Sequence, residues 1–348
     1  MHTPRTPPAP SDAAGGGRTD GDAAVKILLT TTSYQDTPGP HHDALAEAGY
    51  EVVRARGPLH ESEMLELIRT HGGFDGLLNG DDEITADVID AALSSPTPLR
   101  VIAKYGIGLD SIDVDHATAK RIPVLFTPGV NHTTVAEHAF GLMIGLAKHF
   151  KMHLREVEAG RWTRKTGTEL SGKTIAILGM GRIGREVALR AMAFGMKPIG
   201  FDLYWDADFA ETHKVDRAEK MEDVFGKADV ISLHLPLTDE TRELIRAETI
   251  ALMKPGTLVV NTARGGLVNE QDVAEACRTG KLGGYGTDVV NVEPMQSPHP
   301  YQGVDNILLT PHVGSRTVES VGRQAMRATK NLVNFLNGDD DFIQANKF

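Results

Sequence analysis

Short apolar runs alternate with amphipathic segments from Val25 onward. In the first part of the chain, strand-like runs stand at 25–30 ("VKILLT"), 74–80 ("FDGLLNG") and 99–106 ("LRVIAKYG"), and helical patterns stand at 60–72 and 85–93. The segment 40–55 has the pattern of a helix followed by a strand. Short β-runs separated by helices of about 10–15 residues are typical of parallel βαβ units. This part of the chain is therefore predicted to form a parallel α/β domain.

A second alternation begins at Lys173. Its strand candidates are 174–178, 197–201, 229–235, 257–262, 283–289 and 306–309. Helical patterns separate them, except before the last strand, and a long amphipathic segment at 317–338 follows. Six strands of this kind predict a doubly wound parallel sheet of the dinucleotide-binding type. The fold class is thus α/β with two Rossmann-like domains.

Residues 134–150 predict one helix that is apolar around its whole girth. Thr134 followed by Glu137 is a capping-box pattern, which would begin the helix. Two apolar stripes lie side by side along the segment, one of them running from Val135 to Leu146. A helix that is apolar on all sides must be buried, so we expect it to lie between domains or against a second subunit.

Length and charge narrow the possible functions. The 348 residues exceed the ~250–300 at which a single core stops growing, which predicts two domains. The net charge of −11 argues against nucleic acid or an anionic membrane as the main partner. The 14 histidines show no metal-binding spacing, so we expect no metal site.

The N-terminal segment and the single cysteine bear on location. Residues 1–23 are rich in Pro, Gly, Ala and Asp and lack the apolar core of a signal peptide, which predicts a disordered tail. No apolar run reaches the ~18 residues of a membrane span. Cys277 cannot form an internal disulfide, which is consistent with a reducing cytosol, so a cytoplasmic location is expected.

A glycine-rich motif follows the strand at 174–178. It reads Gly179-x-Gly181-x-x-Gly184, opens an amphipathic helix, and is followed by a second strand that ends at Asp202. In this context the glycines allow a tight turn, close approach of a pyrophosphate, and helix–strand packing. A carboxylate at Asp202 would accept hydrogen bonds from the adenosine ribose and repel a 2′-phosphate. The motif therefore predicts NAD rather than NADP.

Three ionisable side chains follow later strands. Arg264 stands in "VVNTARGGLVNE", Glu293 in "GTDVVNVEP", and His312 in "NILLTPHVGS". Each alone fits an ordinary structural role, such as a surface ion pair or a turn. Because ligands of open α/β sheets bind outside the carboxyl ends of the strands, we expect the three to meet there. An imidazole suits proton transfer, a nearby carboxylate favours its charged form, and a guanidinium fork can bind two oxygens.

The chain resembles the D-isomer-specific 2-hydroxyacid dehydrogenases, in particular the phosphoglycerate dehydrogenase-like branch. The resemblance runs from about Lys26 to about Asn334 and is carried by "GMGRIG", "NTARGGLV", "TDVVNVEP", "TPHVGS", "TVAEHAFGLM" and "GRW". It implies a substrate domain at 24–126 and 314–348, and an NAD-binding domain at 127–313, with the active site between them. It also implies a homodimer built on the helix 134–150 and the segment through Trp162.

The same resemblance implies roles for individual residues. His312 would donate and accept the proton, Glu293 would hold its ring, and Arg264 would bind the carboxylate and carbonyl oxygen of a 2-oxo acid. The substrate loop would comprise Lys104, Tyr105, Gly106 and Ile107. Cofactor-binding positions are expected at Gly179, Gly181, Arg182, Ile183, Gly184, Asp202, Leu235, Pro236, Thr241, Thr262, Ala263, Asp288, His312 and Gly314.

Three alternatives share parts of this pattern. Dinucleotide-sensing corepressors of the same fold keep the Arg, Glu and His, and phosphite dehydrogenase keeps them too. Formate dehydrogenases carry glutamine at the position of Glu293, which cannot stabilise an imidazolium by charge. Lys104 replaces an arginine that is common in phosphoglycerate dehydrogenases, and its positive charge suits a substrate with a phosphate or phosphonate group. The sequence leaves the substrate itself open.

Overall fold

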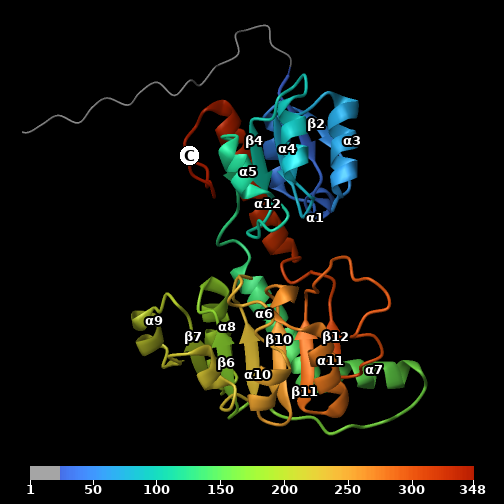
Figure 1. Ribbon diagram of the computed structural model, residues 1–348, viewed down its shortest axis with the longest axis vertical. Helices are drawn as coiled ribbons and strands as arrows, with labels where there is room; N and C mark the ends of the chain where they lie inside the picture. The colour runs from blue at the N-terminus through green and yellow to red at the C-terminus, as the bar shows by residue number, and fades with distance from the viewer. Residues whose placement is uncertain (1–23) are drawn as a thin grey trace, which may run out of the picture. The chain divides into compact units, whose positions relative to one another are not determined.

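The computed structural model describes residues 24–348, so the tail predicted at 1–23 lies outside the described residues. The chain divides into two compact units, and each combines a parallel sheet with helices (Figure 1). Unit 1 contains the described residues up to Pro128 together with Gly322–Phe348, and unit 2 is Gly129–Val321. The second division falls inside the last helix, a few residues after the position 313/314 that the resemblance implies.

Unit 1 is built on a five-stranded parallel sheet in the order β2-β1-β3-β4-β5. The strands are β1 (Lys26–Leu29), β2 (Glu51–Arg54), β3 (Gly76–Asn79), β4 (Val101–Lys104) and β5 (Val124–Leu125). The helices are α1 (Thr32–Asp36), α2 (Pro40–Glu47), α3 (Glu61–His71), α4 (Ala86–Leu93), α5 (Val114–Ala119) and most of α12 (Val318–Asn337).

Alternate strand residues of unit 1 point to two separate cores. Leu77 and Ile102 pack with residues of α3, α4 and α5 on one face. Leu78 and Val101 pack with α1, α2 and α12 on the other face. Successive side chains of a strand point to opposite faces, so a parallel sheet covered on both sides must be apolar at nearly every position. This is why the strand runs in the sequence are continuous rather than alternating.

Unit 2 contains a seven-stranded parallel sheet in the order β12-β11-β10-β9-β6-β7-β8. The strands are β6 (Thr174–Leu178), β7 (Lys197–Phe201), β8 (Asp216–Arg217), β9 (Val230–Leu233), β10 (Thr257–Asn261), β11 (Leu282–Thr287) and β12 (Ile307–Leu309). The helices are α6 (His132–Ala147), α7 (Phe150–Glu158), α8 (Arg182–Ala193), α9 (Ala207–Thr212), α10 (Ala247–Leu252) and α11 (Glu270–Thr279), with short 3-10 turns at Met221–Val224 and Gly265–Leu267.

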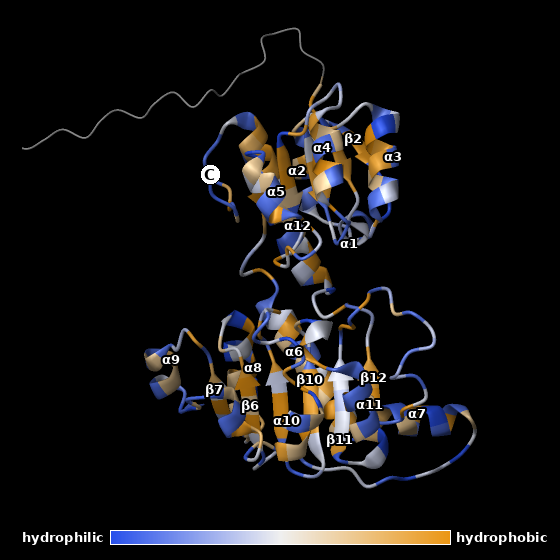
Figure 2. Cartoon of the chain, viewed as in Figure 1, coloured by the Kyte–Doolittle hydropathy of each residue, from blue (hydrophilic) through white to orange (hydrophobic). Residues whose placement is uncertain are grey.

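The two faces of the unit 2 sheet carry different helices. Ile175 and Ile177 pack with α6 and α8, whereas Ala176 and Leu178 pack with residues of α10 and α11. Figure 1 shows α10 and α11 in front of the sheet and α6 behind it. Figure 2 shows the strands as mostly apolar, with β11 paler because three of its residues are glycines. The doubly wound fold predicted from the sequence is therefore confirmed.

The predicted strands of unit 2 are all present, with ends within two residues of the prediction. The two-residue strand β8 was not predicted, because Asp216 and Arg217 are both exposed and carry no apolar signal. Among residues 24–348, no helix has the length and apolar character that crossing a membrane would require.

The prediction of one helix over 134–150 is wrong in two respects. The helix α6 begins at His132, so Thr134 and Glu137 lie inside it and do not form a capping box. It ends at Ala147, because His149 adopts a left-handed backbone conformation with φ of 53°, and α7 starts at Phe150. A single non-glycine residue in this conformation ends a right-handed helix. No pattern in the sequence predicted that His149 would adopt it.

Candidate active site

The strand order of unit 2 places six predicted site segments in a row. All strands of the sheet run parallel, so their carboxyl ends share one edge. Along that edge stand His312 after β12, Glu293 and Asp288 after β11, Thr262 to Arg264 after β10, Leu235 and Pro236 after β9, Gly179 to Gly184 after β6, and Asp202 after β7. The ionisable side chains occupy one half of the edge and the glycine loop occupies the other.

The glycine loop has the shape that a pyrophosphate requires. Gly179 has φ of 97°, and a Cβ there would lie 2.4 Å from the carbonyl oxygen of His234. A Cβ on Gly184 would lie 1.9 Å from the carbonyl oxygen of Gly179, so glycine lets α8 pack against the strand. A Cβ on Gly181 would meet nothing within 4 Å. The space beside Gly181 is therefore open at the N-terminus of α8, where a helix favours an anion.

Asp202 closes the glycine loop from the neighbouring strand end. Its carboxylate accepts hydrogen bonds from the main-chain N–H of Met180 at 2.7 Å and from that of Tyr204 at 2.8 Å. Arg182 and Ile183 start α8 beside this loop, with Arg182 exposed and Ile183 packed toward the core. The structure thus gives Asp202 a local role in fixing the loop, and its predicted contact with a ribose remains a prediction.

Two buried polar atoms near the centre of the edge lack partners. Among the described residues, neither the Thr262 hydroxyl nor Nδ1 of His234 has a hydrogen-bond partner. Burial lowers the pKa of His234 to about 3, so this ring is neutral. Unsatisfied buried polar atoms are rare, and a bound ligand is one way to satisfy them. Both positions therefore fit a bound dinucleotide; the role of Thr262 stays a prediction, and His234 was not foreseen.

Thr241 has a local structural function. Its hydroxyl donates to the carbonyl oxygen of Pro236 at 2.8 Å and accepts from the N–H of Thr238 at 2.8 Å. These bonds close the loop that follows β9 and hold Leu235 and Pro236 at the strand end. The threonine therefore shapes the predicted nicotinamide side of the site.

Asn261 positions the loop that carries Arg264, although the sequence did not single it out. Its buried side chain donates to the carbonyl oxygen of Arg264 at 2.8 Å and accepts from the N–H of Ala263 at 3.0 Å. The Arg264 guanidinium is half-buried and donates to the carbonyl oxygen of Ala263 at 2.7 Å. The only sequence signal for Asn261 is a polar residue at the end of an apolar strand.

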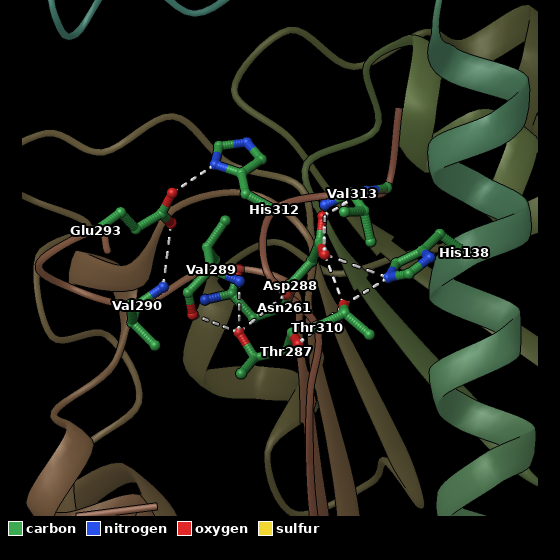
Figure 3. A network of polar contacts seen from close by, with 11 residues as sticks. His138, Asn261, Thr287, Asp288, Val289, Val290, Glu293, Thr310, His312 and Val313 are labelled. Atoms are coloured by element: carbon green, nitrogen blue, oxygen red, sulfur yellow. Dashed lines mark hydrogen bonds and ion pairs between the residues drawn. The ribbon is translucent and has the colours of Figure 1, made fainter. Parts of the chain in front are cut away.

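His312 and Glu293 form a direct pair. Nδ1 of His312 lies 2.7 Å from Oε2 of Glu293, and Oε1 of Glu293 accepts from the N–H of Val290 at 3.2 Å (Figure 3). The two side chains are 43% and 38% exposed. A carboxylate can only accept, so Nδ1 carries a hydrogen and Nε2 is the ring atom that can serve a substrate. His312 also has φ of 51°, a backbone strain that is concentrated at functional sites.

Asp288 holds the His312 loop in place. One carboxylate oxygen accepts from the hydroxyl of Thr310 at 2.6 Å and the N–H of Val313 at 2.9 Å, and the other accepts from the N–H of Gly314 at 2.7 Å. His138 of α6 extends this network, with Nε2 2.8 Å from the Thr310 hydroxyl (Figure 3). Sequence analysis missed His138, because a histidine within an apolar helix gives no sign of its partner.

These hydrogen bonds set the charge state of Asp288. Burial by itself would raise the pKa of Asp288, but the bonds from His138, Thr310 and the two main-chain N–H groups outweigh it, and the pKa is lowered. Asp288 therefore stays ionised and fixes the backbone on both sides of the strained residue. Its predicted contact with the carboxamide of nicotinamide remains a prediction.

The loop that is predicted to bind the substrate lies in unit 1, and its first residue, Lys104, is buried there. Its side chain is 2% exposed, and its ammonium donates to the carbonyl oxygen of Gly80 at 2.5 Å and to Asp81 at 2.7 Å. Tyr105 and Gly106 use their N–H groups inside unit 1, bonding to Asn79 and Thr127. The loop after the preceding strand thus supplies a carboxylate partner for Lys104, and the predicted contact of this lysine with a substrate remains a prediction.

Comparison with known proteins identifies the family. Residues 140–314 match the model of the D-isomer specific 2-hydroxyacid dehydrogenase NAD binding domain. The chain is 41% identical over 254 residues to a hydroxypyruvate reductase of Thermotoga maritima, covering 72% of this chain and 80% of the relative. It is 37% identical over 317 residues to a D-3-phosphoglycerate dehydrogenase of Methanocaldococcus jannaschii, covering 90% of this chain and 58% of that relative.

A solved structure supports the same assignment. The TT0316 protein of Thermus thermophilus superimposes with a TM-score of 0.83 at 34% identity, over 92% of this chain and all of that one. The chain therefore belongs to the D-isomer specific 2-hydroxyacid dehydrogenase family. Its second unit is the NAD-binding domain of that family, which agrees with the open space at Gly181 and the unpartnered Thr262 hydroxyl.

We predict that Thr310→Val weakens the Asp288 network in a pH-dependent manner. At neutral pH the free energy of unfolding should fall by about 1 kcal/mol, the usual contribution of one hydrogen bond. A lowered carboxyl pKa stabilises the folded state above the unfolded value of ~3.9, and this contribution is lost as the pH falls through the folded pKa. The difference between variant and wild type should therefore shrink below about pH 4.

Urea unfolding at a series of pH values measures this effect. Thr212→Val is the matched control, because Thr212 is exposed at the end of α9. If the loss of unfolding free energy in Thr310→Val stays constant from pH 7 to pH 3, ionised Asp288 is not the source of that loss.

Proposed function

We propose that the protein is an NAD(H)-dependent oxidoreductase that interconverts a 2-oxo acid and a D-2-hydroxy acid. The observation that carries the proposal is the His312–Glu293 pair, held at the carboxyl edge of a sheet that also presents a glycine loop open for a dinucleotide. The chain spans 58% of the length of the phosphoglycerate dehydrogenase relative, so its activity as a whole is part of the proposal.

The reduction of a 2-oxo acid needs a hydride on carbon and a proton on oxygen. The bound nicotinamide would supply the hydride. We propose that His312 supplies the proton from Nε2, because Nδ1 is engaged by Glu293. The Glu293 carboxylate stabilises the imidazolium before transfer, and the neutral ring remains correctly oriented afterwards. In the opposite direction the neutral ring accepts the proton from the hydroxyl group.

Arg264 is proposed to bind the substrate. Its loop is fixed by Asn261, which leaves the half-buried guanidinium at the strand end next to β11. A planar fork can bond the carboxylate and the carbonyl oxygen of a 2-oxo acid together. The positive charge would also stabilise negative charge that develops on the carbonyl oxygen as hydride arrives.

We propose that the protein forms a homodimer, but through a surface other than the helix 134–150 that the resemblance implied. Most of α6 is buried against its own sheet, so little of it remains for a partner. By contrast, α7 exposes Phe150, Leu154 and Val157 along one face, and Trp162 follows, 77% exposed. We therefore place the contact on α7 and Trp162, since a contiguous apolar patch favours an interaction site. Lys151 anchors α7 by donating to the carbonyl oxygens of Val304 and Ile307, at the start of β12.

A reducing compartment such as the cytosol remains our proposal for location. It is supported by the presence of a single cysteine, Cys277, which cannot form an internal disulfide. Cys277 is buried in α11, and burial raises its pKa to about 12. A thiol in this state is unreactive toward disulfide exchange.

His312→Ala is expected to abolish turnover and spare cofactor binding. The rate of NADH oxidation with 2-oxo acids should fall at least about 1,000-fold, as expected for loss of the proton donor together with its orientation. The Kd for NADH, measured by fluorescence titration, should change less than about threefold, since the glycine loop is untouched. A comparable loss of NADH binding would contradict the assigned role. If the wild-type protein failed to oxidise NADH with any of the 2-oxo acids tested, a dinucleotide-sensing corepressor would become the better interpretation.

Glu293→Gln should change the pH profile as well as the rate. Glutamine keeps a polar group beside Nδ1 but removes the charge that favours the imidazolium. The alkaline limb of the pH profile for 2-oxo acid reduction should therefore move to lower pH. Steady-state rates from pH 5 to pH 9 give the measurement, and an unmoved limb would separate Glu293 from the proton transfer.

Leu154→Glu should disrupt the proposed dimer. A charge in the centre of the α7 face opposes burial of that surface. Light scattering after size exclusion should show a monomer for the variant and a dimer for wild type. Leu252→Glu, an exposed apolar residue at the end of α10, is the matched control and should remain dimeric. A dimeric Leu154→Glu protein would exclude α7 as the contact.

A further inference from the structure

The segment that carries Glu293 is irregular and exposed. Residues 291–299 lie between β11 and β12 and form neither helix nor strand. Every residue from Asn291 to Pro298 is exposed, whereas the side chain of His299, at the end of the segment, is only 9% exposed. A segment with so little buried surface has few packing contacts to fix its shape. The place of the Glu293 carboxylate therefore depends on what holds the two ends.

One side chain of unit 2, Glu270, contacts both ends of this segment. Its Oε1 accepts a hydrogen bond from the main-chain N–H of Asn291 at 2.8 Å. Its Oε2 lies 3.3 Å from Nε2 of His299. The Glu270 side chain is only 15% exposed, so solvent screens its contact with His299 less than it would at the surface. A single carboxylate thus ties the start and the end of the segment to one point.

The ring of His299 is fixed so that Nε2 faces Glu270. Its Nδ1 accepts from the main-chain N–H of Tyr301 at 3.3 Å, and the two rings meet edge to face with centroids 4.7 Å apart. Because Nδ1 accepts, the hydrogen of the neutral ring is on Nε2. The contact with Glu270 therefore joins an N–H group to a carboxylate oxygen.

The other titratable side chains beside this pair are two tyrosines. Tyr285 packs against Tyr301 with ring centroids 5.5 Å apart. Burial raises the pKa of both, that of Tyr285 to about 12. Both phenols are therefore neutral at the pH of an enzyme assay, so neither adds a charge beside Glu270.

Glu270 stands on a well-supported element. It is the first residue of α11, and the side chain of the preceding Asn269 caps the helix by accepting from the N–H of Asp272 at 3.1 Å. The dipole of a helix stabilises a carboxylate in its first turn. Glu270 therefore links an exposed segment to a capped helix.

The loop of Arg264 touches the same segment. A Cβ on Gly265 would lie 2.1 Å from the carbonyl carbon of Val290, so only glycine allows the two main chains to approach this closely. Gly265 begins the short turn that leads from Arg264 to α11. Glu270 thus fastens the segment of Glu293 to the loop of Arg264.

We propose that Glu270, together with His299, is a positioning residue for proton transfer, which holds the segment 291–299 so that the carboxylate of Glu293 stays against Nδ1 of His312. The inference rests on the proposed function, because it concerns the same pair. Glu270 touches no reacting atom and acts through Glu293. Without it, the carboxylate spends less time beside the imidazole.

Glu270→Gln tests this role. An amide has one accepting and one donating end, so it cannot accept from both Asn291 and His299. We expect kcat for 2-oxo acid reduction to fall at least about tenfold, since a small displacement of a catalytic group costs rate. The alkaline limb of the pH profile should move to lower pH, because Glu293 no longer favours the imidazolium fully. The Kd for NADH should change less than about threefold, since the glycine loop is untouched.

Glu275→Gln is the matched control. Glu275 lies on the same helix, its side chain is 63% exposed, and it faces Arg278 at 3.8 Å. This variant should keep the kcat and the pH profile of wild type. A fall in kcat with an unmoved alkaline limb in Glu270→Gln, in a protein that circular dichroism shows to be folded, would reduce Glu270 to a structural residue and overturn the inference.

The double variant Glu270→Gln with Glu293→Gln shows whether Glu270 acts through Glu293. Residues that act through one another have effects that do not add. Once Glu293 has lost its charge, Glu270→Gln should move the alkaline limb no further. A second shift of similar size in the double variant would mean that Glu270 acts by another route, contrary to the inference.

Two substitutions of His299 test the other end. His299→Leu removes the N–H that faces Glu270, and the alkaline limb should move in the same direction as in Glu270→Gln. His299→Gln keeps an N–H at a similar reach, so its kcat should return to within about threefold of wild type. Equal losses in the two variants, or a wild-type profile in His299→Leu, would refute the contact between Nε2 and Glu270 as the cause.

Hydrogen exchange gives a measurement that needs no turnover. Peptides covering 291–299 should exchange faster in Glu270→Gln than in wild type or Glu275→Gln, because a released segment opens more often. Unchanged exchange would overturn the inference even if the enzyme is active. Faster exchange in a protein whose wild type reduces no 2-oxo acid would instead refute the proposed function, and the catalytic part of the inference with it.

Discussion

Parallel pairing of strands is the constraint on which the rest of the structure depends. In each unit every strand runs in the same direction, so every loop that follows a strand emerges at one edge. In unit 2 this brings together residues that are far apart in sequence, from Gly179 to His312, in the order that the strands occupy in the sheet. The order β12-β11-β10 groups the ionisable side chains, and the order β9-β6-β7 groups the segments expected to hold the dinucleotide.

Carboxylates at these strand ends carry different roles because their partners differ. Asp288 is buried and hydrogen-bonded on both oxygens, which keeps it ionised and makes it an anchor for the loop of His312. Glu293 is partly exposed and faces an imidazole, which suits it to stabilise a charge that comes and goes. Asp82 is buried where desolvation raises its pKa. The residue type alone does not predict the charge state or the role of any of these carboxylates, because the environment of each side chain sets both.

Unit 1 shows how a charge in the sequence can be cancelled in the fold. Lys104 stands 23 residues from Asp81 in the chain, yet β3 and β4 are neighbours, and their last residues Asn79 and Lys104 are paired. This register places the loop after β3 against the lysine side chain. The basic residue that suggested an anionic substrate thereby becomes an internal support for a loop with an exposed acid.

The sequence by itself determined the fold class, the strands of both sheets except the two-residue strands β5 and β8, and the glycine loop, because apolar runs and glycine spacing are local signals. It also singled out His312 and Glu293, which the structure brings within 2.7 Å. It could not show that His138 is a partner of Asp288, that Asn261 holds the main chain of Arg264, or that Asp81 pairs with Lys104. Each of these pairs joins separate segments or depends on one side-chain rotamer. The separation of α6 from α7 at His149 could not be predicted either, because tertiary packing decides whether a single residue adopts the left-handed conformation. Hydrogen-bond partners and net local charge are properties of strand order and register, and these exist only once the sheet has formed.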